Sequence, residues 1–478
     1  MARAGARRGP EGLADSGRGR GSMTPALSRP AARWRLADLP QLHAWLTCWV
    51  ILPNIGFWLL WIIAAPPRHV EILATGVIGL VVRRRSRRVQ FAAFALALAY
   101  SMLSFIAGLF NLAVASLLAS LRFAAELRPG VSVEYAVCAV GIAVILSLAW
   151  RALRRPTGFG SLPSTLIAAA AILAAAGLDF AVSRGMSGAY GRTAADSLFD
   201  SAINASGFAD AADGKRDLIL VVVESMGLPN DPTMRARLTT RWRQPDVAAR
   251  YTLSEGAAPY FGSTTSGEIR ELCGRWGDYY ELVERSDAGC LPAQLAAKGY
   301  RTTAMHSFAG DFFARDAWYP NIGFGRMIFR EALVERGAGV CPGVFPGACD
   351  RDVPTIMRAV LANDTQPQFV YWLTVNSHLP VPADAALRTG DCPATEIAAI
   401  RRFGMICRQF KLWDDIADAL ATQLVRPDFP DADILLVGDH MPPYFDRAQR
   451  SQFDPARVPW ILLRRKREPS AATPLAAR

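Results

Sequence analysis

The 478-residue sequence predicts a multi-pass α-helical membrane domain followed by an α/β domain with a mostly parallel central sheet. Two observations lead to this prediction. Long uncharged apolar segments, suited to a hydrocarbon core about 30 Å thick, crowd into the part before residue 185. The remainder has ordinary globular composition, and short apolar runs alternate there with helical stretches. That alternation is typical of a parallel sheet covered on both faces.

The membrane domain is expected over residues 41–183. Four mostly apolar segments predict spanning helices, namely 41–64, 89–112, 132–150 and 163–183. A fifth segment, 69–82, is shorter. It is counted as a crossing because only then do the arginine clusters fall on one side of the membrane. These clusters are the N-terminal tail, Arg83–Arg88, and Arg151 with Arg154 and Arg155.

The arginine clusters also explain the net charge of +11. Residues 1–40 are rich in Gly, Pro, Ala and Arg without an apolar period, so we expect a disordered basic cytoplasmic tail. The positive charge then reflects membrane topology and gives no reason to expect nucleic acid as a partner. About five crossings place the later chain outside the cytoplasm, with a linker at 184–216, a catalytic domain at 217–466 and a flexible C-terminus at 467–478.

Cysteine usage agrees with an exported second half. Six of the eight cysteines lie there, and an even number in an oxidising compartment indicates disulfides. Many connectivities are possible, and closeness in sequence favours Cys273–Cys290, Cys341–Cys349 and Cys392–Cys407. Free or metal-bound cysteines are the alternative.

Two apolar, β-rich runs of the exported half end on residues that bind metals. Leu218–Gly227 (LILVVVESMG) is typical of a strand buried on both faces and carries Glu224 at its end. Ala432–His440 (ADILLVGDH) ends on Asp439 and His440. Open α/β sheets bind ligands at the carboxyl ends of their strands, so we expect these groups to form a metal site. The alternative for Glu224 is a solvated residue at the start of a loop.

The remaining elements follow from the same patterns. Strands are expected at 218–223, 301–305, 368–375, 433–438 and 460–464, and helices near 265–272, 291–298, 352–362 and 395–425. His306, His378 and His440, the three histidines of this half, each follow a strand-like run. One histidine at a strand end is usually a structural hydrogen-bonding group, whereas three in this position indicate a shared site.

Hydroxyl groups precede the expected helix at 265–272, in the stretch Tyr260–Glu268 (YFGSTTSGE). The N-terminus of a helix favours a phosphate and a developing alkoxide. A hydroxyl becomes a good nucleophile only when a base or a metal activates it, and no histidine lies near in sequence. A metal is therefore expected to do so. The alternative is an ordinary N-cap with spare Ser and Thr residues.

Arg315 lies nine residues beyond His306 in an aromatic stretch, next to Phe312 and Phe313. Its guanidinium could hold a phosphate with two hydrogen bonds. Alternatively, it is a surface arginine whose stem covers the two rings. Sequence patterns alone leave both interpretations open.

Taken together, these motifs resemble those of a known family. Glu224 after an apolar strand, Gly262-Ser263-Thr264, Asn376-Ser377-His378 and Gly438-Asp439-His440 occur in the order that the family shows. With the N-terminal helices, the chain resembles the membrane-anchored phosphoethanolamine and phosphoglycerol transferases of the alkaline phosphatase superfamily. Lipoteichoic acid synthases and lipid A phosphoethanolamine transferases are members of that group that it resembles. An alkaline phosphatase or sulfatase-like fold is implied.

The resemblance implies a role for each motif. Glu224, Thr264, Asp439 and His440 match metal ligands, with Thr264 also the nucleophile, and His378 matches a histidine near the transferred phosphate. His306, Phe312, Phe313 and Arg315 resemble a headgroup-binding segment of the lipoteichoic acid synthases. The local cysteine pairs instead resemble those of the lipid A enzymes. The Cys and Pro near the nucleophile and the Tyr/Arg run of those enzymes are missing here, so the headgroup stays open.

The implied reaction is a headgroup transfer in the inner membrane of a bacterium, with the catalytic domain on the periplasmic side. A divalent metal, Mn or Zn, lowers the pKa of the Thr264 hydroxyl, which attacks a membrane phospholipid. His378 stabilises or protonates the leaving oxygen. The phospho-threonine then passes phosphoethanolamine or phosphoglycerol to an extracytoplasmic glycan or lipid.

Other functions are weighed against this one. The same site could serve a phosphodiesterase or lipid hydrolase with water as the acceptor. An inactive family member could act as a membrane assembly subunit, although every ligand position is filled. A sulfatase needs a C/S-x-P-x-R pattern, which does not occur in the sequence. Alkaline phosphatases use an Asp-Ser nucleophile together with more metal ligands, and the motifs above do not supply that combination.

Overall fold

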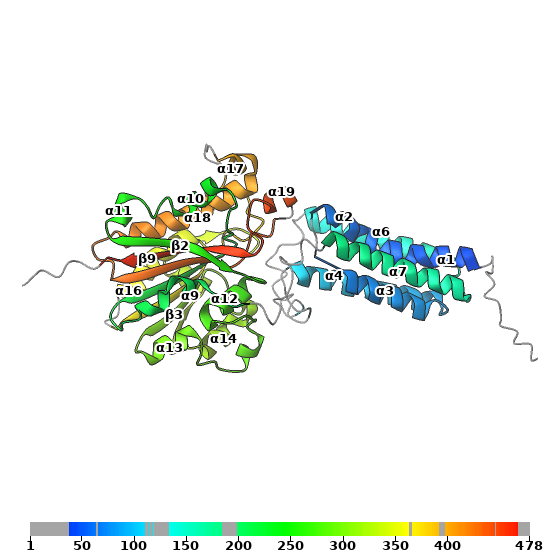
Figure 1. Cartoon of the computed structure of the whole chain (residues 1–478), viewed down its shortest axis with the longest axis horizontal. Helices are drawn as coiled ribbons and strands as arrows, with labels where there is room; N and C mark the ends of the chain where they lie inside the picture. The colour runs from blue at the N-terminus through cyan, green and yellow to red at the C-terminus, as the bar shows by residue number, and fades with distance from the viewer. Residues whose placement is uncertain are drawn as a thin grey trace, which may run out of the picture.

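The structure is a computed structural model. It describes residues 38–63, 66–109, 133–183, 198–362, 366–391, 397–444 and 446–466, with the single residues 114 and 118. Most of the expected tail, the first part of the expected linker and the C-terminus lie outside these residues. A helical bundle and an α/β domain follow one another along the long axis of the molecule (Figure 1).

The bundle contains the expected apolar segments as helices. The first segment is continuous through α1 (Asp38–Leu46), the π-helix η1 (Thr47–Ile51), α2 (Leu52–Leu59) and the 3₁₀ turn η2 (Leu60–Ile63). It is followed by α3 (His69–Val82), α4 (Arg87–Leu109), α6 (Val133–Ala152) and α7 (Leu162–Ser183). Three described helices are long and apolar enough to cross a membrane, namely Asp38–Leu59, Arg87–Gly108 and Leu162–Ser183. Helix α3 and the stretch Ala136–Ala152 are shorter apolar helices.

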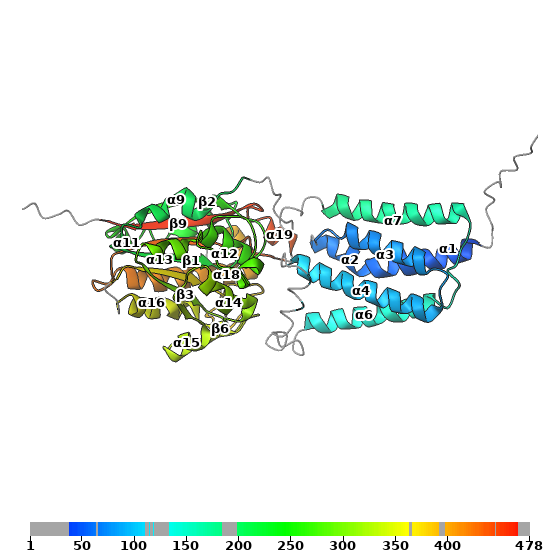
Figure 2. The same cartoon turned by 90° about the horizontal axis from the view of Figure 1, so that it is seen from below.

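The arginine-rich turns share one end of the bundle. Arg83 donates its Nε hydrogen to the carbonyl of Phe159 at 3.4 Å, and this joins the α3–α4 turn to the α6–α7 turn. The backbone N–H of Ser161 donates to Asp38 Oδ2 at 2.9 Å, which adds the start of α1 to this end. The α/β domain lies beyond the opposite end (Figure 2).

The α/β domain is built on a seven-stranded sheet of order β2-β9-β8-β1-β7-β3-β4. Its strands are β1 (Asp217–Val223), β2 (Tyr251–Pro259), β3 (Arg301–His306), β4 (Arg326–Ile328), β7 (Gln368–Leu373), β8 (Ala432–Gly438) and β9 (Arg457–Arg465). Strands β8, β1, β7, β3 and β4 run parallel, whereas β9 pairs antiparallel with β8, and β2 pairs antiparallel with β9 at that edge. Every residue of the central strand β1 is buried, as its unbroken apolar run predicts.

Helices cover both faces of this sheet (Figures 1 and 2). The α-helices are α9 (Ala202–Ser206), α10 (Pro232–Thr239), α11 (Pro245–Ala248), α12 (Thr264–Cys273), α13 (Leu291–Ala297), α14 (Arg315–Asn321), α15 (Arg330–Glu335), α16 (Val353–Ala362), α17 (Ala398–Arg402), α18 (Gly404–Leu424) and α19 (Arg447–Arg450). Short 3₁₀ turns are η6 (Phe208–Ala211), η7 (Tyr280–Val283), η8 (Phe312–Ala314) and η9 (Asp350–Asp352). Helix α18 illustrates how these helices pack. Its buried residues Phe410, Trp413, Leu420 and Leu424 recur at helical spacing, so they form one apolar face that is turned to the core.

The predicted mostly parallel α/β sheet is confirmed, and the structure adds elements that the sequence did not reveal. Strand β2 was not expected because its residues are largely half-exposed and include Gly256. That glycine is needed, since a Cβ there would meet the Trp460 ring at 2.4 Å. The helix expected at 395–425 is two helices, because Phe403 has extended backbone angles between α17 and α18.

Part of the expected linker packs against the α/β domain. Helix α9 and turn η6 contribute Ala202, Ile203 and Phe208 to the same hydrophobic core as β1. Ser201 caps α9 by accepting a hydrogen bond from the N–H of Asn204. The chain therefore enters the catalytic fold before its first strand.

Two of the expected disulfides are confirmed, Cys273–Cys290 and Cys341–Cys349. The second closes a hairpin formed by β5 (Val340–Cys341) and β6 (Gly347–Ala348). The third expected pair includes Cys392, which lies outside the described residues.

Candidate metal centre and pocket

The carboxyl ends of the parallel strands face the helical bundle. Strand β8 ends at Gly438, and the chain then reaches α19, the helix of the α/β domain drawn beside the bundle (Figures 1 and 2). Strand β1 is parallel to β8 and paired with it up to Val223 and Gly438. The residues that follow these two strands therefore lie side by side at this edge.

Glu224, Asp439 and His440 come together as the sequence predicted. Each offers one ligand atom, and these atoms all lie within 4.8 Å of one another. His440 Nε2 is 3.3 Å from Asp439 Oδ2 and 3.6 Å from Glu224 Oε1. Thr264 joins them, because its hydroxyl donates to Glu224 Oε2 at 3.1 Å and lies 3.3 Å from His440 Nε2.

The donor set fits a divalent cation. Asp439 Oδ1 accepts hydrogen bonds from the backbone N–H groups of Ser225 and His440, both at 2.7 Å, whereas its buried Oδ2 has no hydrogen-bond partner. Burial and the charge of Glu224 raise the pKa of Asp439 to about 7. The Nδ1–H of His440 donates to the carbonyl of Met441 at 2.9 Å, so Nε2 carries the lone pair when the imidazole is neutral, the form that binds a metal. Crowded carboxylates beside an imidazole lone pair are ligands for Zn²⁺ or Mn²⁺.

Backbone contacts hold Glu224 in place. Its N–H donates to Thr374 Oγ1 at 2.9 Å, and its carbonyl accepts from Ser377 Oγ at 2.6 Å. Ser225 adopts φ 54° and donates its hydroxyl to Glu224 Oε1 at 2.8 Å. Ser377 belongs to the Asn-Ser-His motif, so that motif positions Glu224 as well as contributing a histidine. The roles of Thr374 and Ser225 were missed, because nothing in their sequence context distinguishes them.

Thr264 is the first residue of helix α12 and is turned toward the metal ligands. The residue before it, Ser263, makes no side-chain capping bond, and its hydroxyl lies 3.1 Å from Thr265 Oγ1. Thr265 itself is fully buried. Gly262 has φ 82°, which only glycine adopts readily, at the turn into the helix. The geometry thus separates the two threonines and brings only Thr264 to the candidate ligands.

A pocket opens beside the candidate metal centre. It is lined by Glu224, Tyr260, Gly262, Ser263, Thr264, His306, Phe312, Phe313, Arg315, Phe345, Leu373, Val375, His378, His440, Met441 and Pro443. All of the site residues that the sequence singled out, except Asp439, are therefore part of one pocket lining. Phe345 was not expected there, and the hairpin closed by Cys341–Cys349 brings it in.

The two remaining histidines line this pocket as neutral groups. Burial and the charge of His440 lower the pKa of His378 to about 4, and its Nδ1 has no hydrogen-bond partner. Burial and the charge of Arg315 lower the pKa of His306 well below its usual value. His306 Nδ1 lies 3.1 Å from the carbonyl of Leu373, whereas its Nε2 has no partner. The Phe345 ring packs edge-on against His378 at 4.7 Å between centroids.

Arg315 is 1% exposed, so it is not the surface residue of the alternative interpretation. Its Nη2 and Nε donate to Glu268 Oε2 at 2.7 and 3.1 Å, and its Nη1 donates to the carbonyl of Phe312. The hydroxyls of Tyr319 and Tyr371 also donate to Glu268. Arg315 lines the pocket as part of this buried network, and its binding of a phosphate remains a prediction.

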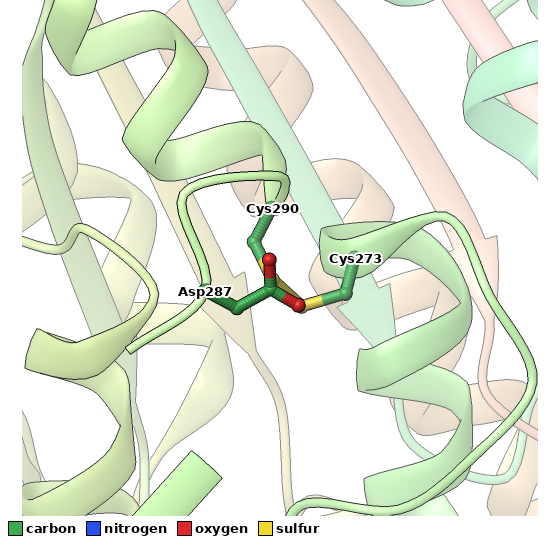
Figure 3. A group of neighbouring side chains, drawn as sticks. All are labelled: Cys273, Asp287 and Cys290. Carbon is green, nitrogen blue, oxygen red and sulfur yellow. A yellow bond between two sulfur atoms is a disulfide. The ribbon is translucent and has the colours of Figure 1, made fainter. Parts of the chain in front are cut away.

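A second group of metal-ligand residue types lies elsewhere in the described chain, formed by Cys273, Asp287 and Cys290. Figure 3 shows the two sulfurs bonded to one another with the Asp287 carboxylate beside them. Zinc binds thiolates, and a disulfide offers none. The group is therefore a structural crosslink next to a carboxylate.

Comparisons with known proteins agree with the predicted catalytic fold. Residues 260–472 match the Sulfatase family model. No curated protein sequence matches the chain. Solved structures that match include the lipoteichoic acid synthase LtaP from Listeria monocytogenes, at 16% identity over 54% of this chain and 71% of that chain, with a TM-score of 0.41.

Two further solved structures belong to named transferases. The Streptococcus pyogenes phosphoglycerol transferase GacH is 16% identical over 54% of this chain and 72% of that chain, with a TM-score of 0.35. The lipooligosaccharide phosphoethanolamine transferase EptA from Neisseria meningitidis is 13% identical over 89% of this chain and 88% of that chain, with a TM-score of 0.49.

Proposed function

We propose that this chain, whose residues 260–472 form a Sulfatase-family domain, is a metal-dependent membrane phosphotransferase. It moves phosphoethanolamine or phosphoglycerol from a membrane phospholipid to an extracytoplasmic glycan or lipid. The observation that supports this most directly is the position of Thr264. Its hydroxyl stands at a helix N-terminus within hydrogen-bonding distance of Glu224 and His440.

The side chains present can perform the first half of the reaction. A divalent metal bound by Glu224, Asp439 and His440 would lower the pKa of the Thr264 hydroxyl. Glu224 accepts the hydroxyl hydrogen at 3.1 Å, so it is positioned to take the proton that Thr264 loses when its oxygen attacks. Thr264 Oγ1 forms a bond to phosphorus as the bond from phosphorus to the diacylglycerol oxygen breaks. His378 lines the same pocket and can donate a hydrogen bond to that leaving oxygen.

The second half returns the threonine to its starting state. A hydroxyl of the acceptor attacks the phospho-threonine, and the bond from Thr264 Oγ1 to phosphorus breaks. Thr264 is the first residue of α12, so a phosphate bound to its oxygen would lie at the helix N-terminus, which favours negative charge. No nucleotide is required, because the energy of the donor ester is carried into the product ester.

The helical bundle suits a donor that never leaves the bilayer. The arginine-rich turns lie at the end of the bundle away from the α/β domain, and the positive-inside rule supports a cytoplasmic position for that end. The catalytic domain is then on the periplasmic side of a bacterial inner membrane, with about five crossings. The strand ends that carry the candidate metal ligands lie on the side of the domain that faces the bundle.

The test uses the full-length protein in vesicles of phosphatidylethanolamine and phosphatidylglycerol, loaded with Zn²⁺ or Mn²⁺, with and without added glycan or lipid acceptors. Thr264→Ala should abolish headgroup release, and the mass added to the Thr264 peptide of the wild type should vanish with it. Thr264→Ser keeps a hydroxyl and should retain part of the activity. Full activity of Thr264→Ala would rule out the mechanism. Headgroup release without any acceptor would instead identify a hydrolase.

A further inference from the structure

We propose that Arg270 is a positioning residue that fixes the helix carrying Thr264 against the segment carrying Asp439 and His440. Through Glu271, it also joins this unit to α9, which is the first helix after the membrane domain among the residues that the structure describes. The inference rests on the proposed function, because it concerns the geometry of the same site. Neither Arg270 nor Glu271 lines the pocket, so they act through the residues that do.

The contacts of Arg270 run to the end of strand β8. Its guanidinium is fully buried and donates from Nη2 to the carbonyl of Gly438 at 2.7 Å and from Nη1 to the carbonyl of Asp439 at 3.1 Å. These carbonyls belong to the residues at which β8 stops and the metal-ligand pair begins. One planar side chain from α12 therefore sets the position of both peptide groups.

Helix α12 also approaches this segment without any intervening side chain. A Cβ at Gly267 would meet the Cα, Cβ and carbonyl oxygen of Asp439, all at 3.1 Å. Gly267 lies between Thr264 and Arg270 on the same helix. Helix α12 thus packs against Asp439 at Gly267 and is hydrogen-bonded to the end of β8 through Arg270. Together these two contacts determine how far Thr264 lies from His440.

Glu271 links Arg270 to helix α9, which follows the bundle in the sequence. Its carboxylate accepts the Nε hydrogen of Arg270 at 2.6 Å. The same carboxylate accepts the N–H groups of Ala202 and Ile203, at 3.2 and 3.1 Å, in the first turn of α9. A fully buried pair of charges thereby links the nucleophile helix, the strand end and the helix that begins the exported domain.

The buried Arg270–Glu271 pair fixes the positions of the backbone groups that it contacts, and this role is distinct from a contribution to stability. Burying two charges costs desolvation free energy, and an apolar pair of similar volume is often equally stable. An apolar pair cannot hold two carbonyls and two amide N–H groups at fixed positions. Residues around metal ligands typically change metal affinity or activity by about 10- to 100-fold when they are replaced.

The test compares Arg270→Met, Arg270→Lys and Glu271→Gln in the full-length protein, with three measurements. These are kcat and KM on vesicle phospholipid, the Kd for Zn²⁺ or Mn²⁺, and the melting temperature. Arg270→Met should lower kcat and metal affinity by about 10- to 100-fold, with KM within about 2-fold. Arg270→Lys keeps the charge and one carbonyl contact and should recover part of both losses. Glu271→Gln should have a smaller effect.

The control is Arg275→Met, which breaks the half-exposed pair with Asp287 and should change none of these values. An Arg270→Met variant that folds and keeps both kcat and metal affinity would overturn the inference. If that variant does not fold, Gly267→Ala tests the same contact, and unchanged kcat and metal affinity in it would also overturn the inference. If the wild type releases no headgroup, the proposed function fails, and metal affinity alone still decides the role of Arg270.

Discussion

The two walls of the pocket are held in different ways. The metal wall consists of residues that follow β1 and β8, neighbouring central strands paired along their whole length. Backbone groups fix these residues, as the contacts of Glu224 and Asp439 show. The aromatic wall consists of Phe312, Phe313 and Phe345, which come from a 3₁₀ turn and a disulfide-closed hairpin. The candidate metal ligands thus rest on the sheet, and the aromatic wall rests on loops.

A buried carboxyl joins the two walls. Asp350 follows the hairpin and accepts the N–H groups of Val375 and Asn376 at 3.0 and 2.7 Å, while Asn376 Oδ1 accepts the N–H of Asp350 at 2.7 Å. Asn376 precedes Ser377, which holds Glu224. The comparison predicts that changes to the metal wall remove the reaction, whereas changes to the aromatic wall mainly alter stability and recognition.

The largest effect is expected on the metal wall. Asp439→Asn removes one ligand charge, so we expect metal affinity to fall by at least about 100-fold and headgroup release to become undetectable. Metal titration and the vesicle assay measure both. Asp287→Asn, at the disulfide of Figure 3, is the matched control and should bind metal like the wild type. Equal metal loss in both variants would contradict the assignment of the metal site.

A large loss of stability is expected at the base of the aromatic wall. Arg315→Met leaves the buried Glu268 without its cation, which costs about 3–5 kcal/mol of unfolding free energy. Arg243→Met breaks the exposed pair with Glu255 and should cost about 0–1 kcal/mol. Adding Glu268→Gln to Arg315→Met should restore part of the loss. Denaturant unfolding measures all three, and no restoration would show that the pair is not the cause.

A moderate effect is expected from the hairpin that carries Phe345. Replacing Cys341 and Cys349 by Ser opens a loop with a sequence separation of 8. Loop-closure entropy then predicts a loss of about 2–3 kcal/mol. Because Phe345 is no longer held, KM should rise several-fold while metal affinity stays unchanged. The same change at Cys273 and Cys290 should leave KM unaltered. A fall in metal affinity in the hairpin variant would mean that the two walls are not separable.

The smallest effect concerns the carboxyl between the walls. Burial raises the pKa of Asp350 to about 6 from 3.8, so the folded protein binds this proton more tightly than the unfolded chain. Its contribution to stability is therefore largest below pH 3.8 and is lost as pH rises through 6. Asp350→Asn cannot titrate, so the melting temperature of the wild type relative to this variant should increase from pH 7 to pH 5. A constant difference would contradict the raised pKa.

The sequence predicted the metal wall better than the aromatic wall for a physical reason. Continuous apolar runs identify buried parallel strands, and the carboxyl ends of such strands meet at one edge whatever the loops do. Glu224, Asp439 and His440 could therefore be grouped without a structure. Phe345 could not, because a hairpin loop has no periodicity, and its position depends on a disulfide partner and on contacts with residues distant in sequence.

Local pattern therefore determined the helical bundle, the parallel sheet and the metal-ligand residue types in this protein. Only the tertiary structure decided that Arg315 is paired with Glu268 and that Arg270 joins α12 to the end of β8. Apolar periodicity is a property of neighbouring residues, and a sequence records it directly. A contact between buried polar groups depends on how separate elements pack, and it exists only once they have packed.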